Sequence, residues 1–139
     1  MKLAILSDIH GNWPALEAVM ANVDGWRPDA VVGNGDVVND GPSNPACWAA
    51  VAGRRARDGW AVLRGNHEEY VAEWRNPATP RAGPAYDLIR LSHWTYRQME
   101  GDVAELATLP EQWLWRAPDG SLLVVMHGTL LGNRAGIYP

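Results

Sequence analysis

Three short apolar runs, each followed by a helical pattern, constrain the fold of this chain more than any other feature. The first run covers residues 2–7, "KLAILS", and the helix after it is expected to begin near Pro14. The apolar positions of that helix have the spacing of one buried face and are Leu16, Val19, Met20 and Val23. Apolar runs this short are typical of strands buried in a parallel sheet.

The order of strand, loop and helix then recurs twice. A second strand is predicted at 30–32, before a glycine-rich loop around Asp36, and a second helix at 44–57. A third strand lies in "WAVLRGNHEE" and ends at Gly65. Strands that alternate with helices pair in parallel through right-handed crossovers, so their exits meet at one edge of the sheet. Open α/β sheets bind ligands at that edge.

The rest of the chain favours helices and one hairpin. Residues 68–109 are predicted to be a helical insertion that is interrupted at 76–85, where proline and glycine are frequent. "APDG" has the composition of a turn and is flanked by predicted strands at 113–116 and 122–126. No repeat or linker divides the sequence, so residues 1–139 are expected to form a single α/β domain.

Charge and composition exclude several classes of partner. The net charge is −4, and the 12 basic residues are scattered rather than gathered in a stripe, which argues against nucleic-acid binding and favours a small ligand. The single cysteine, Cys47, allows no intramolecular disulfide. No apolar run approaches the roughly 20 residues of a spanning helix, and Asp8 interrupts the first run too early for a signal peptide. We therefore expect a cytoplasmic protein without membrane contact.

Four clusters of polar side chains lie at predicted strand exits. They are Asp8 and His10 after the first strand, Asp36 after the second, Asn66 and His67 after the third, and His127 after the last. Each alone has an ordinary interpretation as a loop or helix-capping residue. Together they include three of the four histidines of the chain, at the edge where parallel sheets bind ligands.

This set of donors indicates divalent cations. In an extended backbone, Asp8 and His10 would project from the same side and could share one cation. Carboxylate, imidazole and amide donors suit manganese, iron, zinc or magnesium, and the absence of thiolates argues against a structural zinc site. Asp36 could bridge two cations about 3.5 to 4 Å apart, an arrangement used for displacement at phosphorus.

Four ordered motifs also carry a family resemblance. "SDIHGN", "GNGDVVNDGP", "LRGNHEE" and "VMHGT" resemble the calcineurin-like metallophosphoesterases, especially their small bacterial branch. The resemblance implies a partial four-layer α/β/β/α sandwich with two divalent metal ions at the strand ends. It also implies hydrolysis of small phosphomonoesters or phosphodiesters by a metal-bound hydroxide. Manganese is the metal expected first, with iron, zinc, nickel or magnesium as alternatives.

The same resemblance assigns roles to the candidate residues. Asp8 and His10 would bind the first metal, Asp36 both metals, and Asn66 and His127 the second. His67 would be the catalytic residue. It would stand beside the substrate with Asn66, and would donate a hydrogen bond to phosphoryl oxygen or protonate the leaving group.

Two positions depart from the protein-phosphatase type of relative. That type carries an aspartate paired to the motif histidine and then an arginine, where this chain has Asn39 and Asp40. Asn39 does not raise the basicity of His67 as a carboxylate would, and Asp40 adds negative charge. A phosphoprotein substrate is therefore not expected.

A fifth motif of the family, a Gly-His-Thr-His segment, has no counterpart after His127. Each metal would then lack one protein ligand, and the second sheet would be short of strands, with an open edge. We expect a truncated version of a longer phosphoesterase, with a homo-oligomer that covers the edge as the alternative.

Two other functions remain open at this stage. One is a non-catalytic metal-binding or interaction module of the same fold, and the other a nuclease, against which the scattered basic residues argue. Trp13, beside the first motif, is a candidate for the substrate cleft, but a core or half-buried role is preferred. His93 lies outside the motifs and is expected to be structural.

Overall fold

The first half of the chain forms a parallel sheet covered by two helices. In this computed structural model, which describes residues 1–135, the strands and helices alternate. They are β1 (Leu3–Leu6), α1 (Trp13–Trp26), β2 (Ala30–Asn34), α2 (Asn44–Asp58) and β3 (Ala61–Leu63). The strands are parallel in the order β1-β2-β3, with Leu3 beside Ala30 and Val32 beside Ala61. The predicted parallel βαβ organisation is confirmed.

The second half adds a group of helices and a hairpin. Its elements are α3 (Asn66–Ala72), a 3₁₀ turn η1 (Glu73–Arg75), α4 (Pro84–Gln98), α5 (Val103–Thr108), β4 (Gln112–Arg116) and β5 (Leu122–Met126). β4 and β5 pair antiparallel, with Leu114 beside Val124. The predicted helical insertion and hairpin are confirmed, although α3 begins two residues earlier than expected, at Asn66.

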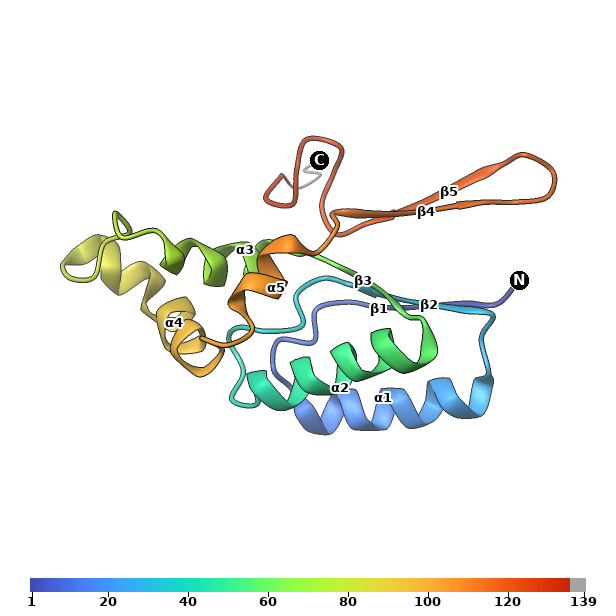
Figure 1. The fold of residues 1–139 in the computed structure, drawn as a ribbon, viewed down its shortest axis with the longest axis horizontal. Coiled ribbons are helices and arrows are strands. Elements are labelled where there is room, and N and C mark those ends of the chain that lie inside the picture. The colour runs from blue at the N-terminus through green and yellow to red at the C-terminus, as the bar shows by residue number, and fades with distance from the viewer. Residues whose placement is uncertain (136–139) are drawn as a thin grey trace.

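The layers fit a partial metallophosphoesterase sandwich. Figure 1 shows α1 and α2 below the parallel sheet and the β4–β5 hairpin above it, with α3, α4 and α5 at the end where the strands exit. β5 contacts β2, and β4 contacts β3. Helices, parallel sheet and hairpin are therefore successive layers, and the helical insertion closes one end of them.

Two apolar clusters hold these layers together. On the helix side, Leu6 and Val62 pack with Leu16 and Trp48. On the hairpin side, Val32 and Leu63 of the sheet pack with Val125. Burial on both faces is typical of a parallel sheet, and the parallel direction of the strands places all three exits at the same edge.

Local signals set the limits of the first two helices. The Asn12 side chain accepts a hydrogen bond from the Ala15 N–H at 3.2 Å, and Pro14 occupies the first turn of α1. Gly59, with a φ of 71°, ends α2 in the left-handed conformation that glycine adopts without strain.

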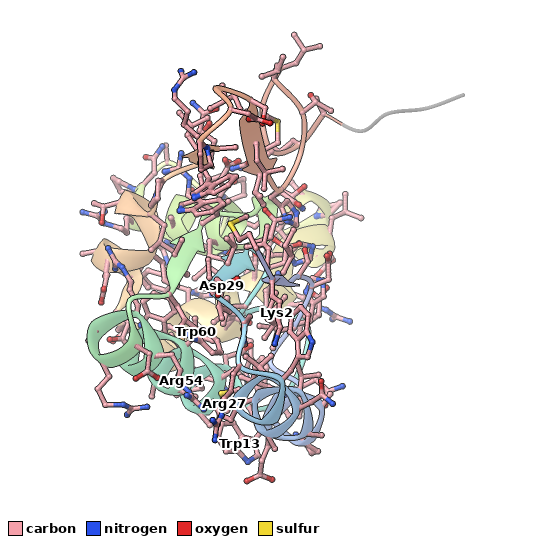
Figure 2. All side chains as sticks on the ribbon, turned by 90° about the vertical axis from the view of Figure 1, so that its right-hand side faces the viewer. Lys2, Trp13, Arg27, Asp29, Arg54 and Trp60 are labelled. Carbon is pink, nitrogen blue, oxygen red and sulfur yellow. The ribbon has the colours of Figure 1, made fainter. Side chains whose placement is uncertain are left out.

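Charged residues close the end of the sheet opposite the strand exits (Figure 2). Arg54 of α2 pairs with Asp24 and Asp58, and its guanidinium lies 5.3 Å from the centre of the Trp60 ring. The Lys2 N–H donates to the Asp29 carboxylate at 2.6 Å. Among residues 1–135, no helix is long and apolar enough to cross a membrane.

Candidate metal centre

The strand exits bring all six predicted site residues to one edge of the sheet. Asp8 and His10 follow β1, Asp36 follows β2, Asn66 and His67 begin α3 directly after β3, and His127 follows β5. His127 follows a strand of the β4–β5 hairpin, which packs on the parallel sheet, and it lies 91 residues beyond Asp36 in the sequence.

Asp36 lies at the centre of this group. Its side chain is only 3% exposed, and its Oδ2 atom is 3.3 Å from His127 Nε2, 3.7 Å from His10 Nε2 and 4.0 Å from His67 Nε2. Two sets of donor atoms lie close enough together to hold a cation, His10 with Asp36 and His67, and Asp8 with Asp36 and His127. Asp36 belongs to both sets, as a bridging ligand would.

The way the donors are grouped differs from the grouping that the family resemblance implies. By distance, His10 stands with His67, and Asp8 with His127. The resemblance instead places Asp8 and His10 on one metal and leaves His67 free of metal. Both groupings give Asp36 the shared position, so the two-centre arrangement does not depend on which is adopted. The ligands of each centre stay predictions.

The expected reason for the proximity of Asp8 and His10 is wrong. Neither is extended, because both have left-handed backbone, with φ of 58° and 48°. The loop is instead folded against the loop after β2, where the N–H groups of His10 and Gly11 donate to the carbonyls of Asp36 and Val37 at 2.9 and 3.0 Å. His10 Nε2 still lies 3.7 Å from Asp8 Oδ1. Strained backbone of this kind is concentrated at functional sites.

His127 provides evidence that a cation fits this centre. Its Nδ1 lies 2.8 Å from the backbone carbonyl of Asn34, and a carbonyl only accepts, so Nδ1 carries the proton. In the neutral ring, the lone pair of Nε2 then faces two further acceptors, Asn66 Oδ1 at 2.8 Å and Asp36 Oδ2 at 3.3 Å. Three lone pairs that converge without a proton between them suit a metal ion. A metal-binding histidine typically donates its other N–H in this way.

Glu68, a fully buried residue, holds the loop of Asp36 and was not predicted from the sequence. Its carboxylate accepts hydrogen bonds from the N–H groups of Asp36, Val37, Val38 and Gly65 at 2.8 to 3.2 Å. Burial raises the pKa of Glu68, and the negative charge of Asp36 raises it further. The available signal was a glutamate three residues after the N-cap residue of the helix, Gly65. Glu68 thus fixes the loop that presents Asp36.

Gly65 allows β3 to approach that loop. A Cβ at this position would overlap Asp36 Oδ1 and stand 2.6 Å from the Asp36 backbone nitrogen. We expect Gly65→Ala to destabilise the protein by roughly 1 to 3 kcal/mol, the usual cost of overpacking. Gly25→Ala, on α1, where the new Cβ would have no atom within 4 Å beyond its chain neighbours and its own helix backbone, should be neutral or stabilising by up to about 1 kcal/mol. Urea unfolding of both variants measures the difference, and equal midpoints would contradict the steric argument.

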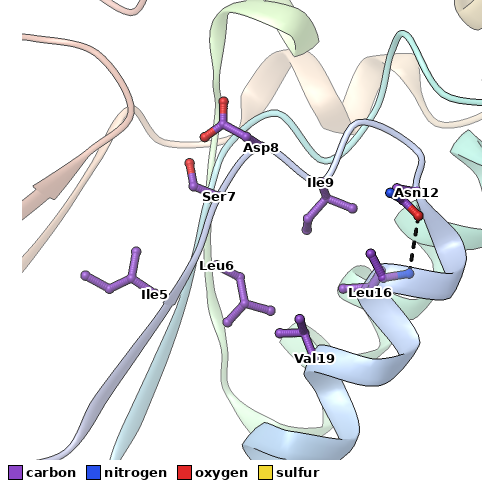
Figure 3. A pocket seen from close by; sticks show the side chains of 9 residues that line it. Ile5, Leu6, Ser7, Asp8, Ile9, Asn12, Leu16 and Val19 are labelled. Atoms are coloured by element: carbon purple, nitrogen blue, oxygen red, sulfur yellow. Dashed lines mark hydrogen bonds between the residues drawn. The ribbon is translucent and has the colours of Figure 1, made fainter.

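Two openings flank Asp8. A cavity of about 640 Å³ lies on one side and is lined by His10, Asp40 and Pro42, among others. On the other side lies an apolar groove of about 300 Å³ between β1 and α1. Figure 3 shows Leu6, Leu16 and Val19 on its walls. β1 is an edge strand, and Ile5 is 51% exposed there. This open edge belongs to the parallel sheet, whereas the open edge expected from the sequence belongs to the second sheet.

Trp13 and His93, the two candidate residues outside the motifs, pack against other side chains. Trp13 is half-buried against the helix-side core. His93, on α4, stacks on Trp74 with ring centres 4.3 Å apart, and its Nδ1 is 3.2 Å from the Tyr86 hydroxyl. Burial lowers the pKa of His93. These contacts agree with the structural role expected for His93.

Comparison with known proteins identifies the family. The family model described as calcineurin-like phosphoesterase matches residues 1–134, so the chain belongs to the calcineurin-like phosphoesterase family. A search of curated proteins found no match.

Two solved structures resemble the chain over nearly its whole length. One is a metallophosphoesterase from Sphaerobacter thermophilus, with 28% identity and a TM-score of 0.70, covering 99% of this chain and 51% of that one. The other is a hypothetical protein from Pyrococcus horikoshii OT3, with 20% identity and a TM-score of 0.80, covering 99% and 59%. The second likeness supports the fold alone. The chain spans between half and three fifths of the length of these two proteins.

Proposed function

We propose that this chain contributes a dinuclear metal centre that hydrolyses small phosphomonoesters or phosphodiesters. The observation that supports this most is the position of Asp36. It is buried, it follows the central strand, and its carboxylate belongs to both sets of potential metal donors. A residue shared in this way is what a two-metal centre for displacement at phosphorus requires.

The residues proposed to hold the two cations are those of the strand exits, namely Asp8, His10, Asp36, Asn66 and His127. Their oxygen and imidazole donors suit manganese first, and iron, zinc, nickel or magnesium as alternatives. When bound, the cations would polarise a phosphoryl oxygen and make water a stronger acid. His10 Nδ1 is buried without a hydrogen-bond partner, which agrees with a ring oriented by a ligand on its other nitrogen.

The chain's own residues define the substrate side of the centre. His67 faces Asp36 through Nε2 and is partly exposed, so it can donate a hydrogen bond to a phosphoryl or leaving oxygen. The exposed carboxylate of Asp40, which is not among the proposed metal ligands, stands at the rim. This negative rim disfavours a polyanion and favours a small phosphorylated substrate. A cytoplasmic location and a homo-oligomer stay predictions.

Release of nitrophenol from mono- and bis-nitrophenyl phosphate with added Mn²⁺ tests the proposal. We expect His67→Asn to lower kcat by about 10² to 10⁴-fold, because it removes the proton donor, while Mn²⁺ still binds. His93→Asn, the matched change on α4, should keep both turnover and metal binding.

Either of two results would count against the proposal. Full turnover of His67→Asn would remove that residue from catalysis. Absence of Mn²⁺-dependent turnover in the unchanged protein would leave a metal-binding module without this activity.

A further inference from the structure

We propose that Asn39, held by Asn44 and Thr95, fixes the neutral His67 ring with its proton on Nε2. In that form His67 is a hydrogen-bond donor to substrate and is not a metal ligand. The proton position follows from hydrogen bonds alone. The effect of this proton position on catalysis rests on the proposed function.

The orientation of the Asn44 amide is set by backbone groups. Its Oδ1 accepts from the Asn39 N–H at 2.8 Å, and its Nδ2 donates to the Gly41 carbonyl at 2.9 Å. An N–H only donates and a carbonyl only accepts, so the amide has one permitted orientation. Nδ2 also donates to Gln98 Oε1 of α4 at 2.9 Å. Asn44 is fully buried at the start of α2.

The Thr95 hydroxyl sets the orientation of the Asn39 amide. The two N–H groups of the Asn44 amide already donate to Gly41 and Gln98 at 2.9 Å, so its 3.5 Å contact with Thr95 Oγ1 is weak. The closest acceptor for the hydroxyl proton is Asn39 Oδ1, at 2.9 Å, whereas the Leu91 carbonyl is at 3.3 Å. Thr95 is fully buried on α4. The carbonyl oxygen of the Asn39 amide therefore faces Thr95.

His67 receives the other end of the Asn39 amide. With Oδ1 turned to Thr95, Asn39 Nδ2 stands 2.9 Å from His67 Nδ1 and donates to it. Nδ1 must then be the unprotonated nitrogen of the neutral ring, so the proton is on Nε2, the atom that faces Asp36. Asp40 Oδ2 is the competing group at Nδ1, but it is 3.5 Å away and half exposed. We expect the shorter contact, with the buried Asn39, to determine which ring nitrogen carries the proton.

His67 and His127 are thus opposite tautomers. His127 donates from Nδ1 to the Asn34 carbonyl and keeps a lone pair on Nε2 for a cation. His67 accepts at Nδ1 and presents N–H at Nε2. Distance alone groups His67 with His10 and Asp36, but an N–H cannot coordinate a metal ion. Asn39, Asn44 and Thr95 are therefore positioning residues for His67.

Heteronuclear NMR of the metal-free protein with isotope-labelled histidine tests the proton position directly. At about pH 8.5, well above the ordinary histidine pKa, we expect the His67 signals to show a proton on Nε2 and none on Nδ1. The signals that disappear in His67→Asn identify the residue. In Asn39→Asp the new carboxylate accepts from the ring, so the proton should move to Nδ1.

Three further variants separate positioning from folding. Thr95→Val should give a mixture of tautomers and lower kcat by about 10 to 100-fold, the usual effect of losing an outer partner, whereas Thr95→Ser should restore both. Asp40→Asn should leave the proton on Nε2. A proton on Nδ1 in the unchanged protein, or a shift in Asp40→Asn but none in Asn39→Asp, would overturn the inference. A protein without turnover whose His67 carries the proton on Nε2 would contradict the proposed function and leave the tautomer assignment standing.

Discussion

Replacing Asp36 by asparagine is expected to abolish the stabilisation that Mn²⁺ gives the protein. A ligand at 100 times its Kd raises the free energy of unfolding by about 2.7 kcal/mol, and we expect this gain in the unchanged protein and almost none in Asp36→Asn. The shared carboxylate would be lost to both sets of donors at once. The loss of affinity should therefore exceed the roughly 100-fold that removal of an outer partner costs.

The metal-free Asp36→Asn protein should be at least as stable as the unchanged one. Asparagine keeps an Oδ1 atom that can accept from the backbone N–H of His67, as Asp36 Oδ1 does at 3.0 Å. It also removes a buried negative charge that raises the pKa of Glu68. Unfolding with and without Mn²⁺ measures both effects, and Asp87→Asn on the exposed side of α4 is the matched control. An unchanged Mn²⁺ shift in Asp36→Asn would remove Asp36 from the metal centre.

The positions of the site residues could be predicted from the sequence because they depend on a simple rule. Parallel strands place their exits at one edge, and each apolar run ends directly before a polar motif. The structure accordingly brings Asp8, Asp36 and His127 together although they are distant in sequence. The motifs then indicated the family, which the family model confirms.

The local conformation of the loops could not be predicted in the same way. The left-handed backbone of Asp8 and His10 depends on hydrogen bonds to the loop after β2, which no short window of sequence contains. The contribution of Thr95 was missed for a related reason. It lies on a helix without a chemical motif, and it reaches Asn39 only because α4 packs against the start of α2.

The β4–β5 hairpin belongs to the second sheet, which the sequence predicted to be short of strands. In the described residues, the second sheet consists of β4 and β5 alone. Leu114 and Leu122 are about half exposed on it. This agrees with the expectation that a second sheet short of strands leaves apolar surface and an open edge.

Glu68→Gln should be the most destabilising single change among those that alter no metal donor. Four backbone N–H groups converge on the two carboxylate oxygens, and the glutamine amide offers one oxygen and one NH₂ group. Two buried N–H donors would therefore face another donor, at about 1 to 3 kcal/mol each. Loss of the buried charge offsets part of this, because burial and Asp36 both raise the Glu68 pKa. We expect a net loss of about 2 to 4 kcal/mol in the free energy of unfolding.

The neighbouring glutamate provides the control for this prediction. Glu69 pairs with Arg134 at 2.9 Å but is partly exposed, so Glu69→Gln should cost less than about 1 kcal/mol. If Glu68 fixes the Asp36 loop, its variant should also bind Mn²⁺ more weakly under conditions where it is still folded, whereas the Glu69 variant should not. Urea unfolding and Mn²⁺ titration of the two variants give both comparisons. Equal unfolding midpoints for the two variants would mean that contacts other than those of the Glu68 carboxylate hold the loop.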